Sequence, residues 1–153
     1  NKNIYEREKK KIVQDLLVPL DNMCGFTNSL KEICNVFPIW LCPIKTFPGE
    51  DTLFSLPSKD DIYVDVGVYG SWDEEDETIS DKPLFLIRNK EIENKLYNND
   101  GLKMLCNMNY YNEEFFWNIY DKKKYNQLKE KYDESNNLLN IYQKVCSFYI
   151  KNF

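Results

Sequence analysis

The sequence predicts an α+β domain in which helices cover one face of a single antiparallel sheet. Two observations indicate this class. The apolar segment Phe37 to Ile44 contains two prolines, and the segment Asp61 to Gly70 alternates strictly between apolar and other residues. Segments with helical periodicity follow shorter apolar runs on both sides of this pair. With 153 residues, 42% of them hydrophobic, the chain is long enough to bury one core. We therefore expect a lead-in over residues 1–12 and one domain over residues 13–153.

The two segments are predicted to pair as neighbouring strands. Proline cannot donate a hydrogen bond to a strand ladder, so Pro38 and Pro43 place the first strand at an edge of the sheet. Successive side chains of a strand point to opposite faces. In the second strand Ile62, Val64, Val66 and Val68 therefore form one buried face, and the other face carries Tyr63, Asp65, Gly67 and Tyr69.

Four further elements complete the predicted sheet. A strand from Gln14 to Leu20 leads into a helix with an apolar stripe, and a second helix runs from Pro83 to Tyr97 before a fourth strand from Lys103 to Asn109. The stripe of the first helix consists of Met23, Phe26, Leu30 and Ile33. The order strand, helix, strand, strand, helix, strand is the split βαβ arrangement of a ferredoxin-like sheet with helices on one face. Its second face is expected to be uncovered.

Helices beyond this sheet are predicted to form a C-terminal appendage. Asn112 is a suitable N-cap for a helix that begins with Glu113. Two more helical segments follow, from about Lys122 to Tyr132 and from Asn137 to Ile150. The stripe of the last segment is expected to be Leu138, Ile141, Val145, Phe148 and Tyr149.

Composition excludes several functions. A net charge of -5 and a pI near 4.9 argue against a nucleic-acid partner, which requires a clustered basic surface. The chain has no histidine, so it cannot assemble a Ser-His-Asp triad or a histidine metal site, and we predict no metal centre. No glycine-rich loop opens a helix to cradle a phosphate. The five cysteines are an odd number within mostly apolar runs, which predicts reduced core residues in a reducing compartment.

The non-valine face of the second strand is the candidate site. Trp40 and Cys42 join Tyr63, Asp65 and Tyr69 there if the register places them on the same side. One interpretation is that these aromatic residues pack against the C-terminal helices or another domain. The other is a substrate surface, which Asp65 favours, because a carboxylate between two tyrosines on an apolar strand needs a partner.

Four ordered segments resemble the C-terminal part of the delta(24)-sterol reductases. They are Val13 to Leu20, Phe37 to Ile44, Asp61 to Gly70 and Asn112 to Asp121. This family, also called 24-dehydrocholesterol reductase, Seladin-1 or Diminuto, is similar to the FAD-linked oxidases of the vanillyl-alcohol oxidase type. The resemblance implies that the chain is the cap domain over the flavin, and that FAD is held mainly by an upstream domain outside this chain.

The resemblance also implies a reaction and a location. NADPH would be the hydride donor to the flavin, and the C24=C25 double bond of a sterol side chain would be reduced. The enzyme would be anchored in the endoplasmic reticulum membrane by an N-terminal segment outside this chain, with this domain on the cytosolic, reducing side. This segment alone is not expected to be active.

The expected site roles follow from this reaction. A hydride added to an isolated alkene requires a proton at the other carbon, so Tyr63 and Asp65 are the candidate acids. Trp40, Tyr69 and Cys106 are the candidate substrate-binding residues, and no residue of the chain is expected to hold the cofactor by itself. The alternative hypothesis is a non-catalytic interaction or structural module derived from the same cap domain.

Overall fold

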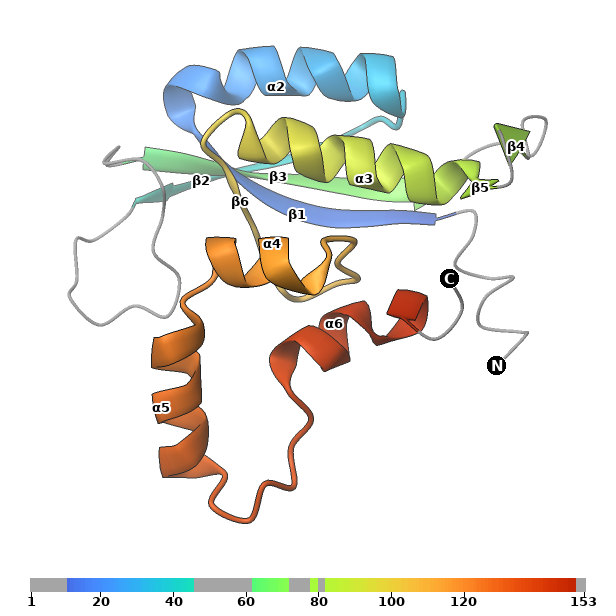
Figure 1. Cartoon of the computed structure of the whole chain (residues 1–153). Helices are drawn as coiled ribbons and strands as arrows, with labels where there is room; N and C mark the ends of the chain where they lie inside the picture. The colour runs from blue at the N-terminus through green and yellow to red at the C-terminus, as the bar shows by residue number, and fades with distance from the viewer. Residues whose placement is uncertain (1–10, 46–61, 72–77, 80–81, 151–153) are drawn as a thin grey trace.

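A computed structural model describes residues 11–45, 62–71, 78–79 and 82–150. Its main sheet has the strand order β2, β3, β1, β6, and every neighbouring pair is antiparallel. The strands are β1 (Lys11–Pro19), β2 (Trp40–Lys45), β3 (Ile62–Ser71) and β6 (Leu102–Lys103). Helices α2 (Leu20–Ile33) and α3 (Leu84–Tyr97) lie together over the sheet (Figure 1). The predicted α+β class is confirmed, and the split βαβ order places the first and third strands in the centre.

Five further elements complete the described chain. Strands β4 (Thr78–Ile79) and β5 (Lys82–Pro83) form a separate two-stranded sheet. The C-terminal helices are α4 (Glu113–Ile119), α5 (Lys122–Tyr132) and α6 (Ile141–Ile150). They lie on the side of the sheet opposite α2 and α3 (Figure 1). The Asn112 side chain accepts a hydrogen bond from the Phe115 amide, which confirms the predicted N-cap of α4. None of the described helices is both long and apolar enough to span a membrane.

The first face of the sheet and helices α2 and α3 enclose the main core. Val64, Val66 and Val68 are buried there, as their alternation in the sequence predicts, whereas Ile62 at the start of β3 is 40% exposed and does not join this core. They pack with Ile12, Leu16, Val18, Phe26, Leu30, Ile92 and Leu96. Full burial of one such side chain contributes about 1.5–3 kcal/mol. The predicted stripe of the first helix is confirmed, because Met23 and Ile33 also pack against this core.

Buried polar pairs connect α3 to the sheet. The amide of Gln14 donates to Asn89 over 2.6 Å, and Lys103 forms an ion pair with Glu93 at 2.5 Å. Both members of the ion pair have fully buried side chains. The Lys103 ammonium group also donates to the carbonyl of Met108, and the backbone amide of Tyr110 donates to Glu93. This network fixes the segment after β6 against α3.

The second face of the sheet is not uncovered as predicted. Tyr63 is 0% exposed and lies in a second core formed with α4 and α6. Its other buried members are Leu17, Leu102, Tyr111, Phe116, Tyr120, Tyr142, Val145 and Cys146. The phenol of Tyr120 donates to the Lys103 carbonyl over 2.6 Å and ties the end of α4 to β6. The aromatic residues of the appendage therefore cover one part of this face.

Several predicted boundaries are wrong. Strand β6 ends at Lys103 and does not reach Asn109, because the Asn109 amide instead donates to the carbonyl of Val145 in α6. Pro83 ends β5 and does not begin α3. Helix α6 begins at Ile141, so Leu138 lies before it and is 67% exposed.

The cysteine prediction needs a similar correction. All five cysteines are free, but only Cys34 and Cys146 are buried. Cys24 and Cys106 are exposed, and Cys42 is half-buried. A cysteine in an apolar run is therefore not always a core residue in this chain, because an exposed strand or segment face can also carry it.

Candidate functional site

The strand register gathers one set of residues on the second face of the sheet. Trp40 lies opposite Gly67 and Cys42 opposite Asp65, so the predicted association of Trp40 and Cys42 with this face is confirmed. On the other side of β3, Asp15 lies opposite Gly67. We call this set the outer patch; it consists of Asp15, Trp40, Cys42, Asp65, Gly67, Tyr69, Cys106 and Asn107.

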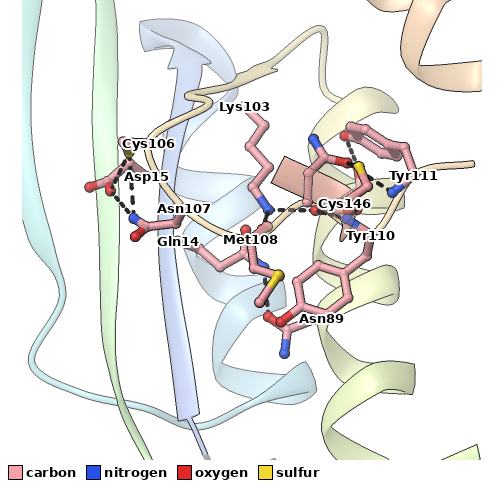
Figure 2. Close-up of polar contacts among 12 residues, drawn as sticks. Gln14, Asp15, Asn89, Lys103, Cys106, Asn107, Met108, Tyr110, Tyr111 and Cys146 are labelled. Carbon is pink, nitrogen blue, oxygen red and sulfur yellow. Dashed lines mark hydrogen bonds and ion pairs between the residues drawn. The ribbon is translucent and has the colours of Figure 1, made fainter. Parts of the chain in front are cut away.

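Asp15 is the polar centre of the outer patch. Its carboxylate accepts hydrogen bonds from the Tyr69 hydroxyl, from Sγ of Cys106 at 3.1 Å and from Nδ2 of Asn107 at 2.9 Å. Figure 2 shows Cys106 and Asn107 against Asp15. The three donors come from β3 and from the segment after β6. Asp15 therefore joins two parts of the chain that are far apart in the sequence.

The ring of Tyr69 crosses directly over Gly67. A Cβ atom built on Gly67 would lie 2.6 Å from a ring carbon and 2.7 Å from the hydroxyl oxygen of Tyr69. Any larger residue at position 67 would therefore displace the ring. Tyr69 is 47% exposed and Trp40 is 59% exposed, so both rings border solvent on this face. Because Gly67 has no side chain, the phenol of Tyr69 on β3 can reach Asp15 on the neighbouring strand β1.

Asp65 is half-buried and differs from Asp15 in its surroundings. Its Oδ1 atom is buried and has no hydrogen-bond partner among the residues that the structure describes. Burial raises the pKa of Asp65, the negative charge of Asp15 raises it further, and a backbone hydrogen bond from Leu16 opposes the shift. This shift increases the fraction of Asp65 that carries a proton at a given pH, and a protonated carboxyl group can deliver that proton.

The neighbouring donors also favour their protonated forms. Burial, followed by the hydrogen bond to Asp15 and the charge of Asp15, raises the pKa of Cys106 to about 11. Burial and the same carboxylate raise the pKa of Tyr69. Cys106 is therefore a thiol at neutral pH and is not suited to nucleophilic attack, which requires the thiolate. The outer patch can hold an uncharged group against two aromatic rings and offer it a proton.

The structure separates the predicted site residues into two groups. It brings together Asp65, Trp40, Tyr69 and Cys106, whereas Tyr63 is buried in the second core. Packing against the C-terminal helices, one of the two interpretations of the aromatic face, therefore holds for Tyr63. Sequence reasoning missed Asp15 and Asn107. Asp15 could have been identified as a carboxylate in the middle of an apolar strand, whereas no feature of the sequence singles out Asn107.

The outer patch suits only part of a flavin cofactor. Two carboxyl groups would repel a pyrophosphate, which proteins usually hold with backbone amides or basic side chains. The exposed rings of Trp40 and Tyr69 instead fit an uncharged ring or an alkyl chain. Among the described residues, no three side chains are grouped to hold a metal ion.

Fold and site together define an α+β domain with a carboxyl and aromatic patch on the outer face of a ferredoxin-like sheet. The chain is similar to delta(24)-sterol reductases, with 29% identity to the human protein over 148 residues and 30% identity to the mouse protein over 149 residues. Both alignments cover 95% of this chain, and the Arabidopsis thaliana relative is 24% identical over 155 residues. The resemblance predicted from the four segments is confirmed.

The alignments cover only part of each relative. The chain spans 27% of the length of the human and mouse proteins and 26% of the plant protein. No family model and no solved structure matches the chain.

Proposed function

We propose that this chain is the C-terminal, substrate-side part of an FAD-dependent, NADPH-using oxidoreductase that reduces the C24=C25 double bond of sterol side chains. The observation that carries the proposal is the similarity to delta(24)-sterol reductases over 95% of the chain. An upstream FAD-binding domain would cover the outer patch. A hydrocarbon substrate and a flavin ring are both groups that the exposed rings of Trp40 and Tyr69 can contact without a charge partner.

Reduction of an isolated alkene needs a proton as well as a hydride. Bound FAD, reduced by NADPH, would supply the hydride. We assign the proton to Asp65, and three features support this choice: its half-burial, its raised pKa and its Oδ1 atom, which has no partner among the described residues. Tyr63 is the other candidate acid, and its complete burial beneath α4 and α6 makes it the less suitable of the two.

The rest of the outer patch would hold the substrate. The rings of Trp40 and Tyr69 would form an apolar wall for the sterol side chain, and burial of apolar surface contributes about 25 cal/mol per Å². The thiol of Cys106 would lie at the edge of this wall. We further propose that the complete enzyme is held at the endoplasmic reticulum membrane, with this domain on the cytosolic side, where its free cysteines would stay reduced.

An assay of the complete protein tests this function. The purified protein is incubated with desmosterol, FAD and NADPH, and the sterol product is identified by mass spectrometry while NADPH oxidation is followed by absorbance. We expect stoichiometric formation of the C24-reduced sterol. No turnover under conditions in which the mouse relative is active would contradict the proposal. It would favour the alternative of a non-catalytic interaction or structural module.

A matched pair of variants connects the activity to the site. Asp65→Asn keeps the shape of the side chain but cannot deliver a proton, so turnover should fall by about 10²-fold or more. Asp21→Asn changes a carboxylate in the first turn of α2, outside the outer patch, and should leave turnover unchanged. Equal activity of both variants would remove Asp65 from the mechanism.

A further inference from the structure

Two neighbouring carboxyl groups of the outer patch, those of Asp15 and Asp65, differ in the hydrogen bonds that they accept. Asp15 pairs with Gly67 and Leu17 pairs with Asp65, so Asp15 and Asp65 are diagonal neighbours on adjacent strands. Diagonal neighbours on one face of an antiparallel pair are roughly 7–8 Å apart. Asp15 accepts three hydrogen bonds, whereas the buried Oδ1 of Asp65 accepts none from the described residues.

We infer that Asp15 is a positioning residue of the proposed reduction, which holds the phenol of Tyr69 over Gly67 and keeps Asp65 in the acid form that delivers the proton. The inference rests on the proposed function and deepens it. It assigns a role to a residue that lies one strand away from the proposed acid.

The hydrogen-bond pattern separates the roles of the two neighbours. The hydroxyl of Tyr69 donates to Asp15, so its proton points at a carboxylate and not toward the solvent side of the patch. Asp65 has an oxygen with no such partner among the described residues. The geometry therefore leaves Asp65 as the group with a proton to deliver.

The groups around Asp65 are consistent with this assignment. Asp15 on β1 is the charged group that raises the pKa of Asp65, and Tyr69 on β3 and Cys106 after β6 are the titratable neighbours on the same patch. Cys42 faces Asp65 from β2. The pKa of Tyr69 and that of Cys106 are both raised, so neither group adds a negative charge at neutral pH. The carboxylate of Asp15 is therefore the charged neighbour whose removal tests the effect on Asp65.

The proposed step balances in atoms and electrons. One alkene carbon gains a hydride, whose two electrons come from NADPH through the flavin. The O–H bond of Asp65 breaks, and its proton forms a C–H bond at the other alkene carbon. The Asp65 carboxylate then takes a proton back from water. Asp15 forms and breaks no bond to the substrate, and it acts through Asp65 and Tyr69.

A titration and a pH profile test the inference together. The titration follows the carboxyl carbon of Asp65 by ¹³C NMR in this chain, in the wild type and in Asp15→Asn. We expect Asp65 to titrate at lower pH in Asp15→Asn, because a like charge has been removed. In the complete enzyme, the alkaline limb of the pH dependence of kcat should move to lower pH by the same amount. Asp21→Asn should change neither measurement.

The outcomes distinguish this inference from the proposed function. An unchanged Asp65 titration in Asp15→Asn, or an activity loss of equal size at every pH, would overturn the role of Asp15. A complete protein without turnover would overturn the proposed function, and the titration would still test the effect of Asp15 on Asp65. If Asp15→Asn does not fold, Asp15→Ser keeps a small hydrogen-bonding group for Cys106 and Asn107, and the same shifts are expected.

Discussion

At the scale of single residues, the outer patch holds one carboxyl group, that of Asp65, where ionisation is unfavourable. Asp65 is half-buried, has an oxygen without a partner among the described residues and lies beside Asp15. Its pKa is raised in the folded chain, so the folded state binds the proton more tightly than the unfolded state does. Stability is therefore lost as the pH rises from the ordinary aspartate pKa through the raised pKa of the folded state. Such a cost is typical of functional sites.

Replacement of the Asp65 carboxyl group by an amide should stabilise the fold at neutral pH. Asp65→Asn cannot ionise, so we expect it to exceed the wild type in free energy of unfolding at pH 7 by about 0.5 kcal/mol. The difference should shrink near pH 3.5, where the wild-type carboxyl is largely protonated in both states. Urea denaturation at the two pH values measures this difference. A variant that is less stable than the wild type at pH 7 would show that ionised Asp65 is not a cost.

The thiol of Cys106 should react slowly although it is exposed. Its pKa of about 11 leaves little thiolate at pH 7.5, so alkylation by iodoacetamide should be roughly a hundredfold slower than for an unperturbed cysteine. Asp15→Asn should speed the reaction, because the carboxylate both accepts the thiol proton and repels the thiolate. Time-resolved peptide mass spectrometry measures the rate at this position. Fast labelling in the wild type would mean that the contact with Asp15 does not control the thiol.

At the scale of elements, a buried ion pair connects α3, β6 and the segment that leads to α4. Lys103 contacts Glu93 and the carbonyl of Met108, and Glu93 also accepts from the backbone of Tyr110. Burial raises the pKa of Glu93, and the charge of Lys103 opposes this shift. The segment 104–111 also carries Cys106 and Asn107 to Asp15. The pair therefore holds in place the segment that supplies two donors to the outer patch.

Loss of one member of this ion pair should lower the free energy of unfolding more than loss of both members. Lys103→Met leaves the Glu93 carboxylate buried without its cation, and we expect a loss of about 3–5 kcal/mol in the free energy of unfolding. The double variant Lys103→Met with Glu93→Gln should recover a large part of that loss, because no buried charge remains. Thermal and urea denaturation of the two single variants and the double variant form a double-mutant cycle. Additive losses in the double variant would contradict the coupling.

At the scale of the whole molecule, two cores lie on opposite faces of one sheet, and the outer patch lies beside the second core. The main core contains α2 and α3, and the second core contains α4 and α6. Trp40 and Tyr69 remain exposed on the face that the second core covers only in part. A patch of this kind would suit the contact with an upstream domain that the proposed function requires.

The chain expressed alone should fold without taking up either cofactor. The described residues offer no cradle for a pyrophosphate, and a single wall over the flavin ring leaves most of FAD in water, so we expect a colourless preparation. Self-association through Trp40 and Tyr69 should appear in analytical ultracentrifugation, and Trp40→Ser should reduce it. A yellow protein with stoichiometric FAD, or micromolar NADPH affinity by calorimetry, would place the cofactor site in this chain.

The sequence by itself determined the sheet and which side chains share a face. The alternation in β3 and the two prolines Pro38 and Pro43 predicted a strand beside an edge strand, because side-chain direction and proline chemistry are local properties. The edge strand β2 begins at Trp40 and not at Phe37, so only Pro43 lies within it. These local properties are sufficient to place Asp65, Tyr69 and Trp40 on one face of the sheet. Periodicity predicted α2 and α3 for the same reason.

Only the tertiary structure decided what lies against that face. The burial of Tyr63 depends on aromatic residues of α4 and α6, and Asp15 receives donors from positions 54 to 92 residues away in the sequence. Asn109, which was predicted to belong to the fourth strand, instead donates a backbone hydrogen bond to Val145 in α6. A periodic pattern shows the direction in which a side chain leaves the backbone. It carries no information about which distant segment fills the space there, and that packing separates the buried tyrosine from the exposed patch.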